Sequence, residues 1–183
     1  QQNKIIASFT IAEKKAVPVL DAPTLAASAP ALIERLQRFQ QQLSDSQIGT
    51  VELKLSAQDL NTAIAHFQSL RDYRGQLWIT AIGDGLIHAD FCRTFNGLPG
   101  SGTLRHFHGQ MTLRPQIVDQ QIQFKVTHIR AATGQVPEEF IAQFPPYVLF
   151  ENDALHPGLS TLLGKLNHLA VADDSLIARR EPV

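Results

Sequence analysis

The segment from Gly49 to Leu70 changes its hydrophobic period halfway along, and this change constrains the fold more than any other feature. Before Ser56, apolar and polar residues alternate, which is typical of a strand with one buried face. After Ser56, the apolar residues recur at helical spacing, at Leu60, Ile64 and Phe67. Ser56 and Asp59 together are typical of a helix start, because a hydroxyl and a carboxylate can bind the unpaired N–H groups there. The sequence therefore predicts a strand that runs directly into a helix over residues 56–70.

A second amphipathic helix is predicted upstream of this segment. Its apolar stripe consists of Leu32, Ile33, Leu36, Phe39 and Leu43. Either Asp21 or Ser28 could cap its start, since each is followed two residues later by proline, which the first helical turn tolerates. We expect the stripe to pack into the core, as such stripes usually do.

The first twenty residues are predicted to form an arm and a connector. Residues 5–11 are rich in β-branched and aromatic side chains, which favours a strand or an arm that joins a sheet edge. Residues 12–19 are predicted to be an extended connector. The chain begins without methionine, so we expect that a preceding segment was removed. A signal peptide, an anchor helix and a cloning boundary all stay open.

The middle of the chain predicts a four-stranded antiparallel meander. The predicted strands are residues 76–82, 86–95, 103–114 and 121–130. The Asp84-Gly85 pair is a strong hairpin signal, residues 96–102 form a loop, and residues 115–120 form a turn. Consecutive strands with short connections usually lie side by side.

The last third of the chain predicts two short helices and a strand. Residues 137–144 can form about two turns before Pro145 and Pro146 end the helix. Residues 157–168 carry a leucine-rich helix face, and residues 169–179 form a strand or a hairpin that turns at Asp173-Asp174. With no internal repeat, residues 1–183 are predicted to be a single α+β domain, an antiparallel meander sheet of five or more strands packed against amphipathic helices.

Composition excludes several classes of function. The chain has 16 basic and 17 acidic residues, a net charge of -1 and no run of like charge, so nucleic acid is not an expected partner. Cys92 is the sole cysteine, which rules out an intramolecular disulfide, and no run approaches the ~20 apolar residues of a membrane span. The glycine-rich loop at residues 96–102 leads into a strand, so it lacks the helix start of a phosphate site. We predict no catalytic residue and no cofactor.

One set of side chains could carry chemistry, on the hairpin of residues 86–113. The set consists of His88, Asp90, Cys92, His106 and His108, which alternation places on one face of the sheet. If the loop joins equally positioned strand ends, Cys92 faces His106 and Asp90 faces His108. Phe91 and Phe107 then lie on the opposite, buried face.

Three interpretations of this set stay open. Imidazole, carboxylate and thiolate groups within cross-strand reach are ligands for zinc or a similar ion. The set could equally be the polar, solvent-facing side of a sheet. The third interpretation is an acid/base pair built on Asp90 and His108.

The order of elements from Thr50 to Arg179 resembles a loosely defined group of bacterial extracytoplasmic domains of unknown function, each behind a single N-terminal anchor. The matching residues in the capped helix are Ser56, Asp59, Leu60, Asn61 and Ile64. Some members of this group are similar to tubular lipid-binding domains, in which a curved sheet wraps a helix and leaves an apolar groove. The resemblance implies a periplasmic or membrane-anchored location, near the membrane through an N-terminal anchor.

These observations favour a non-enzymatic extracytoplasmic domain that binds an apolar or lipid ligand between sheet and helices, or an envelope partner protein. The alternative is a metal-binding protein or metal-dependent hydrolase that uses the histidine and aspartate residues of the 86–113 hairpin. A purely structural accessory domain is a third prediction. The oligomeric state stays open.

Overall fold

The computed structural model describes residues 10–11, 22–45, 49–96, 104–131, 134–142, 146–148, 161 and 163–182. Its larger sheet has the strand order β3, β4, β5, β6 and β7, with β1 paired to β5 and β8 paired to β6. All these pairings are antiparallel. The strands are β1 Thr10–Ile11, β3 Leu77–Gly83, β4 Leu86–Asn96, β5 Leu104–Val118, β6 Gln121–Ala131, β7 Gly134–Gln135 and β8 Tyr147–Val148. The predicted α+β class and the antiparallel meander are confirmed.

A smaller sheet joins a strand from the first third of the chain to the C-terminal hairpin. Its strands are β2 Val51–Ser56, β10 Ser175–Arg180 and β9 His168–Ala172, with β10 in the middle. The last hairpin turns at Asp173-Asp174, as predicted. The pairing of β2 with β10 is antiparallel and was not expected from the sequence.

Three hairpins of the structure use two-residue turns in which both residues have positive φ. These pairs are Asp84-Gly85, Asp119-Gln120 and Asp173-Asp174, with φ between 49° and 76°. Such turns match the twist of the flanking strands, and Asp is one of the few residues besides Gly that tolerates this conformation. The predicted turn over 115–120 is shorter than expected, because β5 continues through the buried Pro115 to Val118. Pairing with β4 ends at Leu113, and proline is tolerated where a strand has a free edge.

The helices are α2 Ala22–Ser44, α3 Ala57–His66, the 3-10 helix η1 Gln68–Tyr73 and the single turn α4 Glu138–Ile141. Ser28 is not a helix cap, because α2 begins at Ala22 and the Ser28 hydroxyl donates to the carbonyl of Thr24 at 2.8 Å. Asp21 lies outside the described residues. The capping box at Ser56 and Asp59 is confirmed.

The remaining predicted elements are confirmed in part. In the arm, Thr10 and Ile11 pair with Phe107 and His106 of β5, and the other residues of the segment 1–20 lie outside the described part. Most of the predicted helix over 157–168 also lies outside it, although Thr161 and Leu163 are helical.

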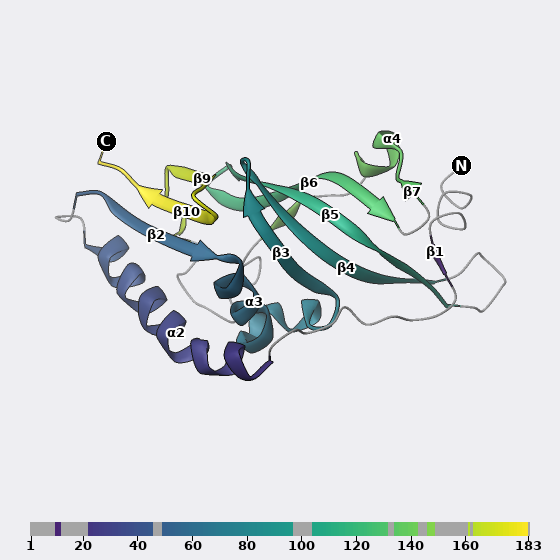
Figure 1. The fold of residues 1–183 in the computed structure, drawn as a ribbon. Helices are drawn as coiled ribbons and strands as arrows, with labels where there is room; N and C mark the ends of the chain where they lie inside the picture. The colour runs from purple at the N-terminus through teal and green to yellow at the C-terminus, as the bar shows by residue number, and fades with distance from the viewer. Residues whose placement is uncertain are drawn as a thin grey trace.

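The two sheets and two helices surround a common interior. In Figure 1 the long strands β3 to β6 run above α3, and α2 lies beneath β2. Helix α3 contacts β3, β2 and α2, and β9 contacts β5 and β3, so the small sheet adjoins the end of the large one. The predicted packing of the sheet against both amphipathic helices is confirmed, and it positions the cavity described next.

Candidate functional site

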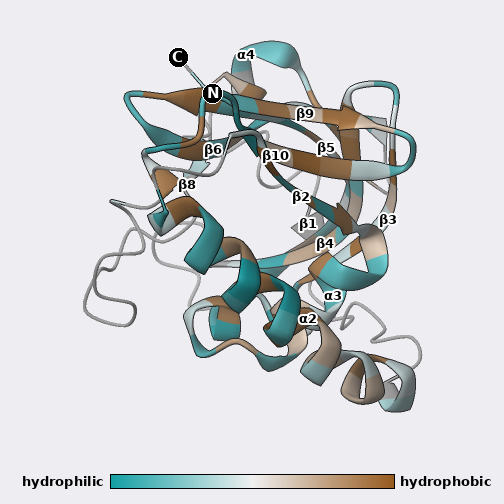
Figure 2. Cartoon of the chain, turned by 90° about the vertical axis from the view of Figure 1, so that its left-hand side faces the viewer, coloured by the Kyte–Doolittle hydropathy of each residue, from teal (hydrophilic) through white to brown (hydrophobic). Residues whose placement is uncertain are grey.

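An apolar cavity of about 480 Å³ lies between the helices and the two sheets. Helices α2 and α3 line it with Leu32, Leu36, Phe39, Leu43, Leu60 and Ile64. The large sheet contributes Leu77, Ile79, Ile87, Leu113, Ile122 and Phe124, and the small sheet contributes Leu53, Leu55, Leu169, Leu176 and Ala178. Figure 2 shows the hydrophobic segments of β9 and β10 opposite α2 across this interior. Aliphatic and aromatic side chains thus dominate the described lining.

Helix α2 forms one wall of the cavity and is fixed at three points. In its middle, Arg35 donates to both carboxylate oxygens of Asp59 at 3.0 Å and to the carbonyl of Lys54 at 2.7 Å. At its C-terminal end, Lys165 and Arg180 each donate to the carbonyl of Leu43 at 3.1 Å. Cations at this end also interact favourably with the helix dipole. Towards the other end, α2 is tied to α3 by a hydrogen bond from Gln58 to Ser28 at 2.9 Å.

Helix α3 owes its position to two local arrangements. Ser56 accepts from the backbone N–H of Asp59 at 3.1 Å, and Asp59 accepts from the backbone N–H of Ser56 at 2.9 Å. The buried Asn61 donates to the carbonyl of Ile79 and accepts from its N–H, both at 2.8 Å. The Asn61 amide therefore takes the place of a neighbouring strand at the edge of β3, where a bulge interrupts the pairing. Ser56, Asp59 and Asn61 thus orient α3, whose residues Asp59, Leu60 and Ile64 line the cavity.

Asp59 is the charged residue among the described residues that line the cavity. Burial alone would raise the pKa of its carboxyl group, but hydrogen bonds from Arg35 and Ser56 outweigh burial and hold the pKa below its usual value. Asp59 is therefore ionised at neutral pH and is paired with Arg35.

Two tyrosines lie close together beside the sheet. Tyr73 lines the cavity and contacts Tyr147 edge to face, with ring centroids 6.2 Å apart. Burial raises the pKa of the Tyr147 hydroxyl, although the neighbouring Arg93 acts in the opposite direction. Tyr147 is thus neutral at physiological pH.

A second, charged cleft of about 440 Å³ lies between α2 and β2. Its ion pairs are Arg35 with Asp59, Arg38 with Glu34, and Glu52 with both Lys54 and Arg179. The hydrogen bond from Arg179 lowers the pKa of Glu52. Each of these four cations already has a carboxylate partner, so the charges of the cleft are engaged in ion pairs within the protein.

The candidate metal ligands share a face, but they pair differently from the prediction. Cys92 lies opposite His108, Asp90 opposite Gln110, His88 opposite Thr112, and Thr94 opposite His106. The predicted pairing of Cys92 with His106 and of Asp90 with His108 is therefore wrong by two residues. A two-residue shift keeps every side chain on its face, because the side-chain period of a strand is two.

Gly109 accommodates the observed register. It lies opposite Phe91, and the Phe107 ring leans over it to stack on Phe91, with centroids 4.9 Å apart and 17° between the planes. The predicted register would have placed the two rings directly opposite each other. A glycine opposite an aromatic ring leaves the space that this diagonal stacking needs.

The described residues bring together only part of the predicted metal set. The Cys92 sulfur lies 3.7 Å from His108 Nε2, whereas His106 Nδ1 is 3.0 Å from the Thr94 hydroxyl and His88 Nδ1 is 3.5 Å from that of Thr112. Among the described residues, no group of three or more His, Cys, Asp or Glu side chains could hold a metal ion. Asp90 and His108 are not direct cross-strand partners, because Asp90 lies opposite Gln110. The metal hypothesis stays a prediction, with Cys92 and His108 as its closest pair.

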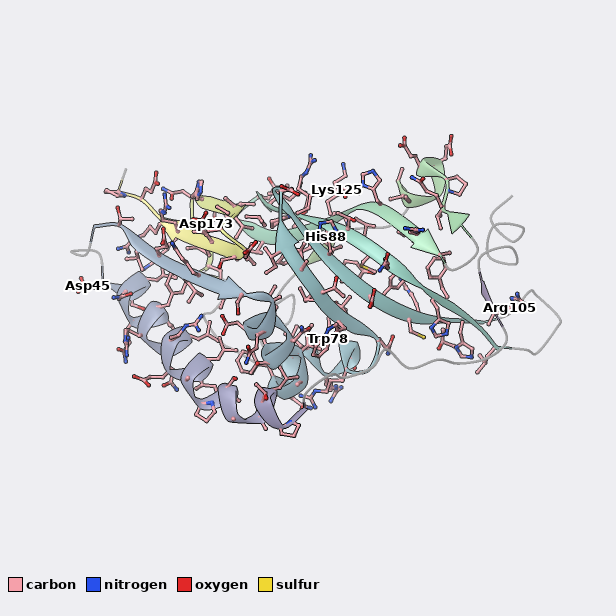
Figure 3. The ribbon with its side chains drawn as sticks, viewed as in Figure 1. Asp45, Trp78, His88, Arg105, Lys125 and Asp173 are labelled. Atoms are coloured by element: carbon pink, nitrogen blue, oxygen red, sulfur yellow. The ribbon has the colours of Figure 1, made fainter. Side chains whose placement is uncertain are left out.

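The outer face of the sheet is polar, but parts of it are not open to solvent. Figure 3 shows His88 and Lys125 on the side of the sheet away from α2. Cys92 and His106 are only 3% and 6% exposed, so the solvent-facing interpretation is wrong for these two residues.

The sequence did not reveal the cavity residues of the C-terminal hairpin. Leu169, Leu176 and Ala178 line the cavity because β10 pairs with β2. Alternation along the strands identifies the buried face of β10, but no local signal says which strand it joins.

Comparison with protein-family models, with curated proteins and with solved structures finds no match to this chain. In the part of the chain that the structure describes, no helix combines the length and the hydrophobicity needed to cross a membrane.

Proposed function

We propose that this protein is a non-enzymatic binding domain that holds an apolar, chain-like small molecule in the cavity between its sheets and helices. The cavity itself carries the proposal. Its volume of about 480 Å³ falls within the ~300–1,000 Å³ of small-molecule sites, and its described lining is almost entirely apolar.

The chemistry of the lining supports the proposal. Apolar surface gains free energy when it leaves water for an apolar partner, at about 25 cal/mol per Å². Water is a poor filler, because a buried water needs about three hydrogen bonds and this lining offers few polar partners. An apolar ligand fits the lining better than solvent does.

The exposed surface favours a small molecule over a partner protein. The large apolar side chains that are exposed on the described surface are Ile33 on α2, and Leu104 and Val118 at opposite ends of the 15-residue strand β5. Protein interfaces usually need a contiguous apolar patch, which scattered single residues do not provide. A ligand between the layers is therefore our proposal, and an envelope partner protein is the less favoured one.

The location outside the cytoplasm is part of the proposal and rests on the resemblance in element order. Fractionation of cells that express the natural gene would test it. We expect the protein in the periplasmic or membrane fraction, and recovery in the cytoplasmic fraction alone would contradict this location.

A fluorescence titration with N-phenylnaphthylamine, an uncharged apolar probe, tests the binding function. We expect enhanced, saturable fluorescence with the native protein. Ala63 lines the cavity from α3, so Ala63→Phe should weaken binding at least about tenfold, because the ring takes up volume that the probe needs. Ala65→Phe is the matched control, since Ala65 has similar burial on the same helix but is not among the described lining residues.

Two results would contradict the proposal. One is the absence of saturable probe binding to the native protein. The other is equal weakening by Ala63→Phe and Ala65→Phe, because the probe would then bind elsewhere or report only altered folding.

A further inference from the structure

We infer that the ligand's polar end is uncharged and lies against Gln37 and Gln40 of α2. This inference rests on the proposed function and adds the chemical class of the ligand. It favours a long-chain alcohol, ester or amide over a fatty acid.

The mouth of the cavity lies along one stripe of α2. Ile33, Gln37 and Gln40 line the same cavity as the buried stripe beside them, yet all three are exposed, Ile33 by 41%. Residues spaced by four and three positions lie on one side of a helix. Side chains that both line a cavity and reach solvent mark its opening. The polar end of an apolar ligand should therefore emerge at this stripe.

The charges around the cavity disfavour an anionic head group. The described lining contains no Lys, Arg or His, and its sole carboxylate is Asp59. The cations beside the lining already have partners. Both terminal nitrogens of Arg35 donate to Asp59. Lys165 and Arg180 donate to the carbonyl of Leu43. A carboxylate that rests against the described lining would lose part of its hydration there, and it would have to compete for these cations with the partners they already bind.

The two glutamines suit an uncharged polar group. A glutamine amide has two N–H donors and a carbonyl acceptor, so it can bind the oxygen and the hydrogen of a hydroxyl group. Gln37 and Gln40 are the described residues of the mouth that can do this without introducing charge.

Competition against N-phenylnaphthylamine with two ligands of the same chain, oleyl alcohol and oleic acid, tests the inference. At about pH 8 the fatty acid is ionised in solution. We expect the native protein to bind the alcohol about tenfold tighter or more, because the lining offers no partner for the desolvated carboxylate. Equal or tighter binding of oleate would overturn the inference while leaving the proposed function intact.

A charge introduced at the mouth gives the second test. Gln40→Arg should strengthen oleate binding relative to the alcohol and so reduce or reverse the preference. Gln41→Arg is the control, because Gln41 is exposed on the same helix and is not among the described lining residues. An equal effect of the two variants would overturn the placement of the head group. If neither ligand displaces the probe and the probe itself does not bind, the proposed function falls and the inference falls with it.

Discussion

Two residues, Gly109 and Asn61, shape the local geometry of the main sheet. Gly109 allows the stacking of Phe107 on Phe91 and lies close to the backbone of β6. Asn61 satisfies both backbone groups of Ile79 at the bulged edge of β3. Neither role can be predicted from the sequence alone, because each depends on a strand whose neighbour is fixed by the tertiary fold. In contrast, the faces of β4 and β5 are predicted correctly, since alternation is a local property.

Gly109→Ala should destabilise the protein by about 2–3 kcal/mol, as overpacking in well-packed sites does. An added Cβ would collide with the carbonyl oxygen of Arg130 and lie 2.9 Å from Cε1 of Phe107. Urea unfolding followed by circular dichroism measures the change. Gly49→Ala is the control, because nothing lies within 4 Å of its added Cβ, and it should be neutral or slightly stabilising. Equal stability of the two variants would contradict the close approach of Gly109 to the backbone of β6 and to Phe107.

Asn61→Leu should also destabilise, by about 2–4 kcal/mol, because two buried backbone groups at Ile79 lose their partners. The exposed Gln58→Ala control removes one exposed hydrogen bond and should change the unfolding free energy by no more than about 0.5 kcal/mol. Amide hydrogen exchange gives a more specific measurement. The Ile79 amide should exchange faster in Asn61→Leu, and unchanged protection there would contradict the role of Asn61.

At the scale of elements, local signals identify where α3 begins but not where it ends. Ser56 and Asp59 are three positions apart, so the capping box is visible in the sequence and is confirmed. The predicted helix over residues 56–70 is too long, because α3 ends at His66 and a 3-10 helix follows. The side chain of Arg74 donates to the carbonyls of Ile64 and Phe67 at this end, at 3.1 and 3.0 Å. That contact depends on the path of the chain after the helix, which no local pattern specifies.

The ion pair between Arg35 of α2 and Asp59 of α3 should make the stability of the protein depend on pH. The folded pKa of Asp59 lies below its unfolded value of about 3.9, so its stabilising effect is complete above that pH. The effect is lost as the pH falls through about 4 towards the folded pKa. We therefore expect Asp59→Asn to be less stable than the native protein at neutral pH, with the difference shrinking at about pH 3.

Urea midpoints measured at both pH values check this expectation. Glu34→Gln is the control, because the exposed pair of Glu34 with Arg38 should contribute at most about 0.5 kcal/mol at either pH. A difference between native protein and Asp59→Asn that stays constant with pH would contradict the role of the ionised carboxylate.

At the scale of the whole molecule, the cavity arises from long-range pairing that the sequence does not specify. The ion pair of Glu52 and Arg179 joins residues 127 positions apart, and the small sheet that it stabilises closes one end of the interior. The sequence predicts the fold class, the meander and most of the apolar stripe of α2, because these follow from periodicity. The expected burial of Ile33 is wrong, because this side chain is 41% exposed at the edge of the stripe. It does not predict the small sheet or the cavity volume, because these depend on which separate elements meet.

The occupancy of the cavity is most directly tested by native mass spectrometry of the protein purified without detergent or organic solvent. We predict a population heavier than the chain by one noncovalently bound apolar molecule, which disappears after organic extraction and returns on incubation with oleyl alcohol. The Ala63→Phe variant should retain less of this molecule than Ala65→Phe. A native protein that shows only the mass of the chain, before and after incubation with the alcohol, would contradict a ligand-binding cavity.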